Sequence, residues 1–141
     1  MNHFKIFVVD DDVYYLNMFK QHLLNLGCEN VTLFESGTDC LNHLDEKPDV
    51  IFLDHQMDTL NGYEVLKKIK RVNPNLYVVI ISAQENMKTA IDSLKHGAFD
   101  YLQKGDDEMM KVEQVLKKIE EVKDLLQRSK PSFIKTIFKF L

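Results

Sequence analysis

The sequence has few of the residues that mark several classes of protein. Only 3 prolines and 5 glycines occur among 141 residues, and 45% of the chain is hydrophobic, so a disordered or low-complexity chain is excluded. Its 2 cysteines, Cys28 and Cys40, are too few for a disulfide framework and lie in predicted helices without metal-ligand spacing. We therefore expect one globular domain in a reducing compartment.

Long hydrophobic runs and an excess of positive charge are also lacking. No apolar run approaches the roughly 18 residues of a membrane span, and the N-terminal apolar run is broken early by Asp10, which argues against a signal peptide. The net charge of -4 gives no overall attraction to polyanions. These absences predict a soluble, cytoplasmic protein that does not bind nucleic acid directly.

Short apolar runs alternate with amphipathic segments along the chain. The predicted strands span residues 4–9, 31–34, 50–54, 76–81 and 99–102, and the predicted helices begin near residues 13, 37, 62, 85 and 107. In the third helix we expect Tyr63, Leu66 and Ile69 to point inward and the basic residues, Lys70 among them, to face solvent. This alternation predicts βαβ units and a doubly wound parallel α/β sheet.

Polar residues follow four of the predicted strands. Asp10 and Asp11 end the first strand, Asp54 the third, Ser82 the fourth and Lys104 the fifth. Because parallel strands end at one edge of the sheet, these side chains should converge there. Crowded carboxylates repel one another, and a hard cation such as Mg²⁺ relieves that repulsion while leaving room for phosphate oxygens. The pattern therefore predicts phosphoryl chemistry with a carboxylate nucleophile.

Four stretches in this order resemble response-regulator receiver domains of two-component signalling. They are Ile6–Asp12, Asp54–Gly62, Ile80–Ala83 and Gly97–Lys104. The resemblance covers residues 4–128 and implies a flavodoxin-like five-stranded sheet of order 2-1-3-4-5 with five helices. It implies a receiver domain over residues 1–128. Beyond the resemblance, the residues themselves indicate an amphipathic, basic tail over residues 129–141.

The same resemblance implies roles for individual residues. Asp54 would accept a phosphoryl group, and Mg²⁺ would be bound by Asp10, Asp11, Asp54 and the backbone carbonyl of Gln56. Lys104 and Ser82 would bind the phosphoryl group.

Two positions are implied to act as a switch, and two depart from the family. Ser82 would move on activation and Tyr101 would turn inward with it. Asp58 and Gly105 stand where the family often has proline, the latter directly after Lys104.

Other residues near these motifs receive structural interpretations. Asp12 is expected to cap a helix, and Tyr15, like Tyr14, to be a helix-face aromatic. Glu108 lies in the first turn of the last helix, where acids suit the helix dipole. His55 should point away from the nucleophile because side chains alternate along a strand.

The resemblance implies a stand-alone switch, phosphorylated by a sensor histidine kinase or a phosphotransfer protein, that acts by binding an unidentified downstream protein. Such a protein is not an enzyme beyond its own phosphorylation and dephosphorylation. Two alternatives remain open: a haloacid-dehalogenase-like phosphatase with Asp10 as nucleophile, and a receiver-like scaffold that works without phosphate.

The C-terminal tail carries an apolar face of helical spacing. That face consists of Phe133, Ile134, Ile137, Phe138 and Leu141, with lysines elsewhere. We consider three interpretations: packing on its own domain or on a second copy in a homodimer, docking to a partner, and contact with a membrane surface.

Overall fold

The computed structural model describes residues 1–57, 59–84 and 86–129. Five parallel strands form one sheet in the order β2-β1-β3-β4-β5, which confirms the predicted fold. The strands are β1 (Lys5–Val9), β2 (Asn30–Phe34), β3 (Val50–Asp54), β4 (Tyr77–Ser82) and β5 (Asp100–Gln103). The helices are α1 (Val13–Asn25), α2 (Gly37–Leu41), α3 (Gly62–Val72), α4 (Met87–Lys95) and α5 (Glu108–Arg128), with a 3₁₀ turn at Leu44–Glu46.

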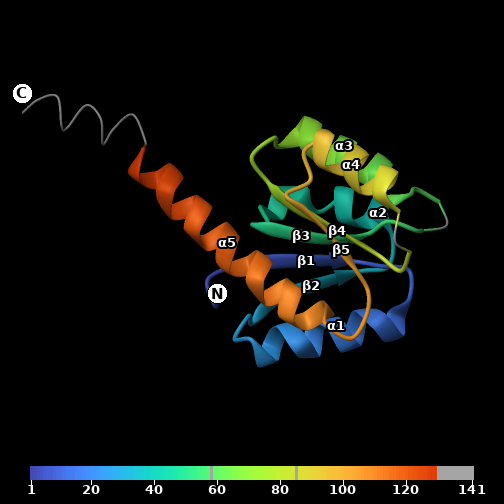
Figure 1. Ribbon diagram of the computed structural model, residues 1–141, viewed down its shortest axis with the longest axis horizontal. Helices are drawn as coiled ribbons and strands as arrows, with labels where there is room; N and C mark the ends of the chain where they lie inside the picture. Colours follow the sequence, from blue (N-terminus) through green and yellow to red (C-terminus); the bar gives the residue numbers. More distant parts are fainter. Residues whose placement is uncertain (58, 85, 130–141) are drawn as a thin grey trace, which may run out of the picture.

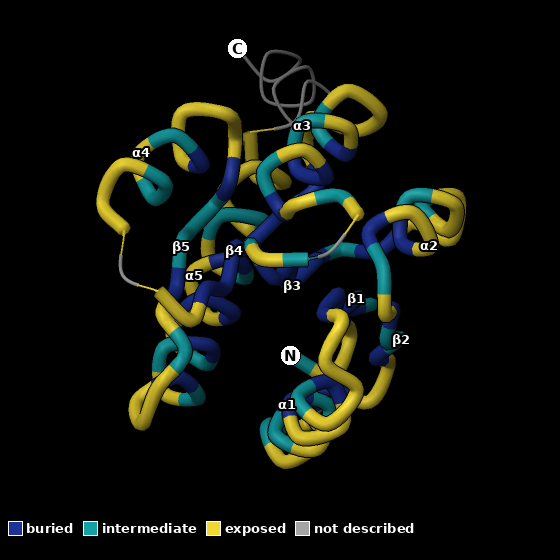
Figure 2. Tube along the Cα trace, turned by 90° about the vertical axis from the view of Figure 1, so that its right-hand side faces the viewer, coloured by how far each residue is buried: buried dark blue, intermediate teal, exposed yellow. Residues whose placement is uncertain are grey.

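Helices cover both faces of the sheet. Figure 1 shows α1 and α5 on one side of the strands and α2, α3 and α4 on the other. Along β3, Val50 and Phe52 pack into the core beneath α1 and α5, whereas Ile51 and Leu53 pack beneath α2 and α3. A strand buried on both faces needs an uninterrupted apolar run, such as the one that leads into Asp54. Figure 2 shows the buried strands at the centre and the exposed outer faces of the helices.

The two helices on the first face are anchored by evenly spaced apolar residues. Asp12 caps α1, as expected: its side chain accepts hydrogen bonds from the backbone amides of Tyr14 and Tyr15. Buried side chains at three- and four-residue spacing then face the sheet: Leu16, Phe19 and Leu23 on α1, and Val112, Val115, Leu116 and Ile119 on α5. The last turns of α5 extend past the sheet in Figure 1, and Leu125 and Leu126 there are exposed.

The prediction for the third helix was wrong in two places. Val65 is buried beside Leu66 and Ile69, whereas Tyr63 is half-exposed and its hydroxyl contacts the His96 ring at 2.9 Å. A tyrosine hydroxyl needs a polar partner, and this one finds it at the C-terminal cap of the neighbouring helix α4. Lys70 is half-buried instead of solvated, because its ammonium donates to two backbone carbonyls of the following loop at 3.1 and 2.6 Å.

Smaller expectations were also tested. Cys28 is buried in the connection after α1 and does not lie in a helix, while Cys40 lies in α2; both thiols are free. His55 lines a cavity with residues of α3 and α4 and with none of the converging acids, in line with its predicted orientation.

Within the described ranges, no helix is both long and apolar enough to cross a bilayer. The tail from residue 130 onward lies outside the described residues, as does Asp58, so the interpretations of both stay predictions.

Candidate functional site

Three carboxylates meet at the edge of the sheet where the parallel strands end. Asp10 and Asp11 follow β1, and Asp54 is the last residue of β3. One oxygen from each lies within 4.8 Å of the other two. Asp10 and Asp54 are buried, with 2% and 6% of their surface exposed, while Asp11 is exposed and forms the outer side of the cluster. The structure thus brings the predicted acids together.

Lys104 partly neutralises this cluster. Its Nζ lies 2.9 Å from Asp10 Oδ2 and 3.3 Å from Asp54 Oδ1. Its backbone amide donates to the Ser82 carbonyl at 2.8 Å, which fixes the start of the loop after β5 beside β4. Burial alone would lower the pKa of Lys104, but the hydrogen bond to Asp10 and the charge of Asp54 outweigh it, so the pKa is raised and the ammonium stays charged.

In the metal-free protein, the pKa of the Asp54 carboxyl lies above the usual value for an aspartate. Burial, and next the charge of Asp10, raise its pKa to about 6, and Lys104 opposes this shift only in part. A carboxylate with this environment gains from a nearby hard cation. Carboxylate oxygens are the donors that Mg²⁺ prefers, and two of the three carboxylates here belong to buried residues. The residues present therefore fit a magnesium ion.

The two predicted switch residues converge on one loop residue. Ser82, 1% exposed at the end of β4, accepts a hydrogen bond at 3.2 Å from the amide of Gln84. Tyr101 on β5 is half-exposed, and its hydroxyl donates to the Gln84 carbonyl at 3.4 Å. Both side chains therefore hold the same loop. Gln56, whose carbonyl was predicted to bind metal, is exposed in the loop after β3.

Two residues of the site were not predicted. The ammonium of Lys104 lies 3.9 Å from the centre of the Tyr15 ring, and the Tyr15 hydroxyl donates to Glu108 Oε1. Burial raises the pKa of Tyr15 above its usual range, with Glu108 adding to the shift. Burial also raises the pKa of Glu108, offset in part by the Tyr15 hydrogen bond and by Lys104. Their position was the only sequence signal for these two residues: Tyr15 lies four residues after Asp11, and Glu108 lies four residues after Lys104.

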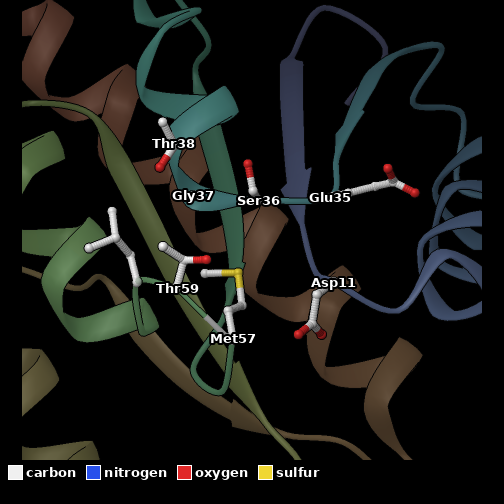
Figure 3. Close-up of a pocket in the computed structure, with 8 residues that line it drawn as sticks. Asp11, Glu35, Ser36, Gly37, Thr38, Met57 and Thr59 are labelled. Atoms are coloured by element: carbon white, nitrogen blue, oxygen red, sulfur yellow. The ribbon is translucent and has the colours of Figure 1, made fainter.

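A cavity of about 230 Å³ opens beside the acids. It is lined by the loops that follow β1, β2 and β3 and by the first turn of α2, namely Asp11, Glu35, Ser36, Gly37, Thr38, Met57, Thr59 and Leu60. In Figure 3, Asp11 lies on one side of this cavity and Met57 and Thr59 lie opposite. The acid cluster is therefore approachable from the side of Asp11.

Gly62 is required by the close approach of α3 to Asp54. A Cβ at Gly62 would lie 2.5 Å from the Asp54 carbonyl oxygen and 2.8 Å from the His55 Cα. We expect Gly62→Ala to lower the free energy of unfolding by about 1–3 kcal/mol, because only the backbone that carries Asp54 can move away. Urea unfolding of this variant measures the loss.

Gly105→Ala provides the matched control, because a Cβ there has no neighbour within 4 Å. It should unfold at nearly the wild-type urea concentration. Equal midpoints for both variants would contradict the close approach of α3.

Comparison with known proteins supplies the family. The family model for the response regulator receiver domain matches residues 6–119. The chain belongs to this family. Receiver domains bind Mg²⁺ at an acidic pocket, and this receiver domain has an acidic cluster at the corresponding edge of its sheet. The resemblance of the four sequence motifs is thereby confirmed.

Relatives and solved structures agree with this assignment. The transcriptional regulatory protein ZraR of Salmonella typhimurium is 40% identical over 98 residues, covering 69% of this chain and 22% of that protein. The DNA-binding transcriptional regulator NtrC of Klebsiella pneumoniae is 38% identical over 101 residues, covering 71% of this chain and 21% of that protein. The chain thus spans about a fifth of the length of these curated relatives.

Among solved structures, a receiver domain protein from Clostridium thermocellum has a TM-score of 0.79 at 31% identity, covering 86% of this chain and 97% of that one. The BeF3-activated receiver domain of DrrB has a TM-score of 0.68 at 30% identity, covering 81% of this chain and 97% of that one.

The raised pKa of Asp54 predicts how this receiver domain binds metal at different pH values. Below about pH 6 the Asp54 carboxyl holds a proton in the metal-free protein, and Mg²⁺ must displace it. The Mg²⁺ affinity should therefore fall about tenfold per pH unit below pH 6 and level off above it. Calorimetric titrations at several pH values measure this. An affinity that is flat between pH 5 and pH 7 would contradict the acidity of Asp54.

Proposed function

We propose that this receiver domain is a phosphoacceptor switch of a two-component phosphorelay and that Asp54 is the residue phosphorylated. The position of its carboxylate supports this proposal. It ends the central strand, lies 3.3 Å from the Lys104 ammonium, and has an oxygen within 4.8 Å of oxygens of Asp10 and Asp11. A carboxylate in this position can attack phosphorus while a fixed cation faces the phosphoryl oxygens.

In the proposed reaction, the phosphoryl group moves from a phosphohistidine to Asp54. An ionised Asp54 oxygen forms a bond to phosphorus, the P–N bond breaks, and the leaving imidazole takes up a proton. The Lys104 ammonium compensates the negative charge that the phosphoryl oxygens carry in the transition state. The Ser82 hydroxyl then binds the phosphoryl group on Asp54.

The metal ligands in this proposal are Asp10, Asp11, Asp54 and the backbone carbonyl of Gln56. A bound Mg²⁺ supplies charge neutralisation at the phosphoryl oxygens. Asp10 and Asp11 hold their oxygens next to Asp54 before any metal arrives.

Asp54 is a better nucleophile than Asp10 in this geometry. Asp10 Oδ1 accepts from the Asp12 amide at 2.9 Å and Asp10 Oδ2 accepts from Lys104 at 2.9 Å, so both oxygens are engaged. Within the described part of the chain, the contact to the Asp54 carboxylate is the ion pair with Lys104, whose ammonium lies 3.3 Å from Oδ1. Together with the family assignment, this favours the phosphoacceptor over the phosphatase with Asp10 as nucleophile.

The output of the switch is binding to a downstream protein. Phosphorylation draws the Ser82 hydroxyl toward Asp54, which changes its contact with Gln84 and through it the position of Tyr101. Tyr101 lies on a surface between α4, β5 and α5 that contains a cavity of about 270 Å³. Its lining residues are Asn86, Met87, Ala90, Tyr101, Gln103 and Lys111. The donor is a sensor histidine kinase or a phosphotransfer protein, and the domain acts as an enzyme only on its own phosphoryl group.

Phosphorylation by a small donor tests this function directly. The full chain is incubated with acetyl phosphate and Mg²⁺, the acyl phosphate is reduced with borohydride, and the labelled peptide is identified by mass spectrometry. We expect one label on Asp54, lost in EDTA and in Asp54→Asn. The control is Asp124→Asn, an exposed acid near the far end of α5, which should be labelled like the wild type.

The two alternatives give different results in this experiment. Label on Asp10 would establish the phosphatase-like chemistry. A folded wild-type protein that is labelled nowhere, and that binds no beryllofluoride in Mg²⁺, would be a scaffold that works without phosphate.

A further inference from the structure

The side chain of Lys104 is not fixed by the residue that follows it. The next residue, Gly105, is exposed, and even a Cβ there would meet nothing within 4 Å. The backbone of Lys104 is tied to Ser82, but its long side chain crosses toward β1 with four rotatable bonds. Its position beside the acids must therefore be fixed by contacts from other elements.

Tyr15 supplies such a contact from α1. The Lys104 ammonium lies over this ring, 3.9 Å from its centre, while it also pairs with Asp10 and Asp54. The ring is itself held by the core, since its centre lies 5.8 Å from that of Phe19, which is fully buried. A cation over an aromatic ring is attracted by the ring's negative face.

Glu108 ties the ring to the other end of the same loop. It is the first residue of α5, four residues after Lys104, and only 6% of its surface is exposed. It accepts the hydrogen bond from the Tyr15 hydroxyl. One tyrosine thus contacts both Lys104, where the loop begins, and Glu108, where α5 begins after it. A buried carboxylate is retained in this position although burial opposes its charge.

We propose that Tyr15 and Glu108 are positioning residues that hold the Lys104 ammonium where it meets the transferred phosphoryl group. The proposal rests on the proposed function of Asp54 as phosphoacceptor. The Tyr15 ring sets the direction of the Lys104 side chain, and Glu108 sets the orientation of the ring. Neither residue touches the phosphoryl group.

Two pairs of variants test the parts separately. Tyr15→Leu removes the ring and Tyr15→Phe only the hydroxyl, while Glu108→Ala removes the acceptor and Glu108→Gln keeps an acceptor of the same size. The rate constant for phosphorylation by acetyl phosphate in saturating Mg²⁺ is measured as a function of donor concentration. We expect the maximal rate constant to fall about tenfold in Tyr15→Leu and in Glu108→Ala, with smaller losses in the two conservative variants.

The matched control is Tyr14→Leu, because Tyr14 is the adjacent tyrosine with 83% of its surface exposed. It should phosphorylate at the wild-type rate. The conservative variants keep the volume of the side chain, so they keep the test valid if a larger truncation fails to fold.

A double-mutant cycle separates positioning from general support of the fold. In a Lys104→Met background, Tyr15→Leu and Glu108→Ala should cause almost no further loss of rate, because the group they position is gone. Slow rates in that background are followed over long incubations, and 19F NMR of bound beryllofluoride gives a second readout of the same cycle.

Losses that multiply in the Lys104→Met background would overturn the positioning role, as would a wild-type rate in folded Tyr15→Leu. A wild-type protein that is not labelled on Asp54 would instead overturn the proposed function. The two failures are therefore distinct.

Discussion

Lys104→Met should destabilise the metal-free protein by about 2–4 kcal/mol, because it leaves two buried carboxylates without their cation. Asp10 and Asp54 are 2% and 6% exposed, and both lie within 3.3 Å of the ammonium that is lost. Methionine keeps the length and much of the volume of the lysine stem, so the change is mainly electrostatic. Urea unfolding in EDTA measures the loss.

Saturating Mg²⁺ should recover much of this stability. The ion binds the folded acid cluster and not the unfolded chain, so it stabilises the variant by mass action, and the variant lacks the ammonium that competes for the same oxygens. Phosphorylation of Asp54 should nevertheless stay about 100-fold slower, because the cation that faces the phosphoryl oxygens is missing.

Lys117→Met is the control for this experiment. Lys117 lies on α5 in a surface pair with Glu113, with 61% of its side chain exposed, and its loss should change neither stability nor labelling appreciably. Identical unfolding curves for Lys104→Met and the wild type in EDTA would show that the pair of buried acids does not need Lys104.

The position of Lys104 could be predicted from the sequence because it depends only on the order of strands. Every strand of a parallel sheet ends at the same edge, so the residue that follows each apolar run is placed there once the alternation with helices is recognised. Asp10, Asp54 and Ser82 were found in the same way. These predictions need no knowledge of how any helix is rotated.

Contacts between helices could not be predicted in this way. Tyr15 and Glu108 lie 93 residues apart on α1 and α5, and they meet because both helices cover the same face of the sheet. The sequence gives the apolar face of each helix but not its rotation or its height along the sheet. From the sequence, Tyr15 was therefore predicted only to be an aromatic residue on the face of a helix.

Tyr63 shows the same limit on the other face. The spacing of Tyr63 with Leu66 and Ile69 fits an inward-facing stripe, yet Val65 fills the space under α3. The 100° step of a helix leaves a residue at the edge of the stripe free to turn either way. The partner, His96 directly after α4, decides the direction for Tyr63, and no pattern within one helix contains that information.

Asp54→Asn should stabilise the metal-free protein above pH 6. Burial raises the folded-state pKa of Asp54 to about 6, so the folded protein holds this proton more tightly than the unfolded chain does. The contribution of the protonated group is fully present below about pH 4 and is lost as the pH rises through 6. An amide never ionises, so the variant escapes this loss, and we expect a gain of about 1–3 kcal/mol at pH 7.5 in EDTA.

The gain should shrink as the pH is lowered and vanish well below pH 4, where the wild-type carboxyl is protonated in both states. In Mg²⁺ the wild type should become the more stable of the two proteins, because at residue 54 an aspartate offers the metal a charged oxygen and an asparagine does not. Urea unfolding at pH 4, 6 and 7.5, with and without Mg²⁺, measures both changes, and Asp124→Asn corrects for the loss of one negative charge. A variant that is no more stable than the wild type at pH 7.5 in EDTA would show that Lys104 fully compensates the buried carboxylate, and that Asp54 is ready to bind metal at any pH above its ordinary pKa.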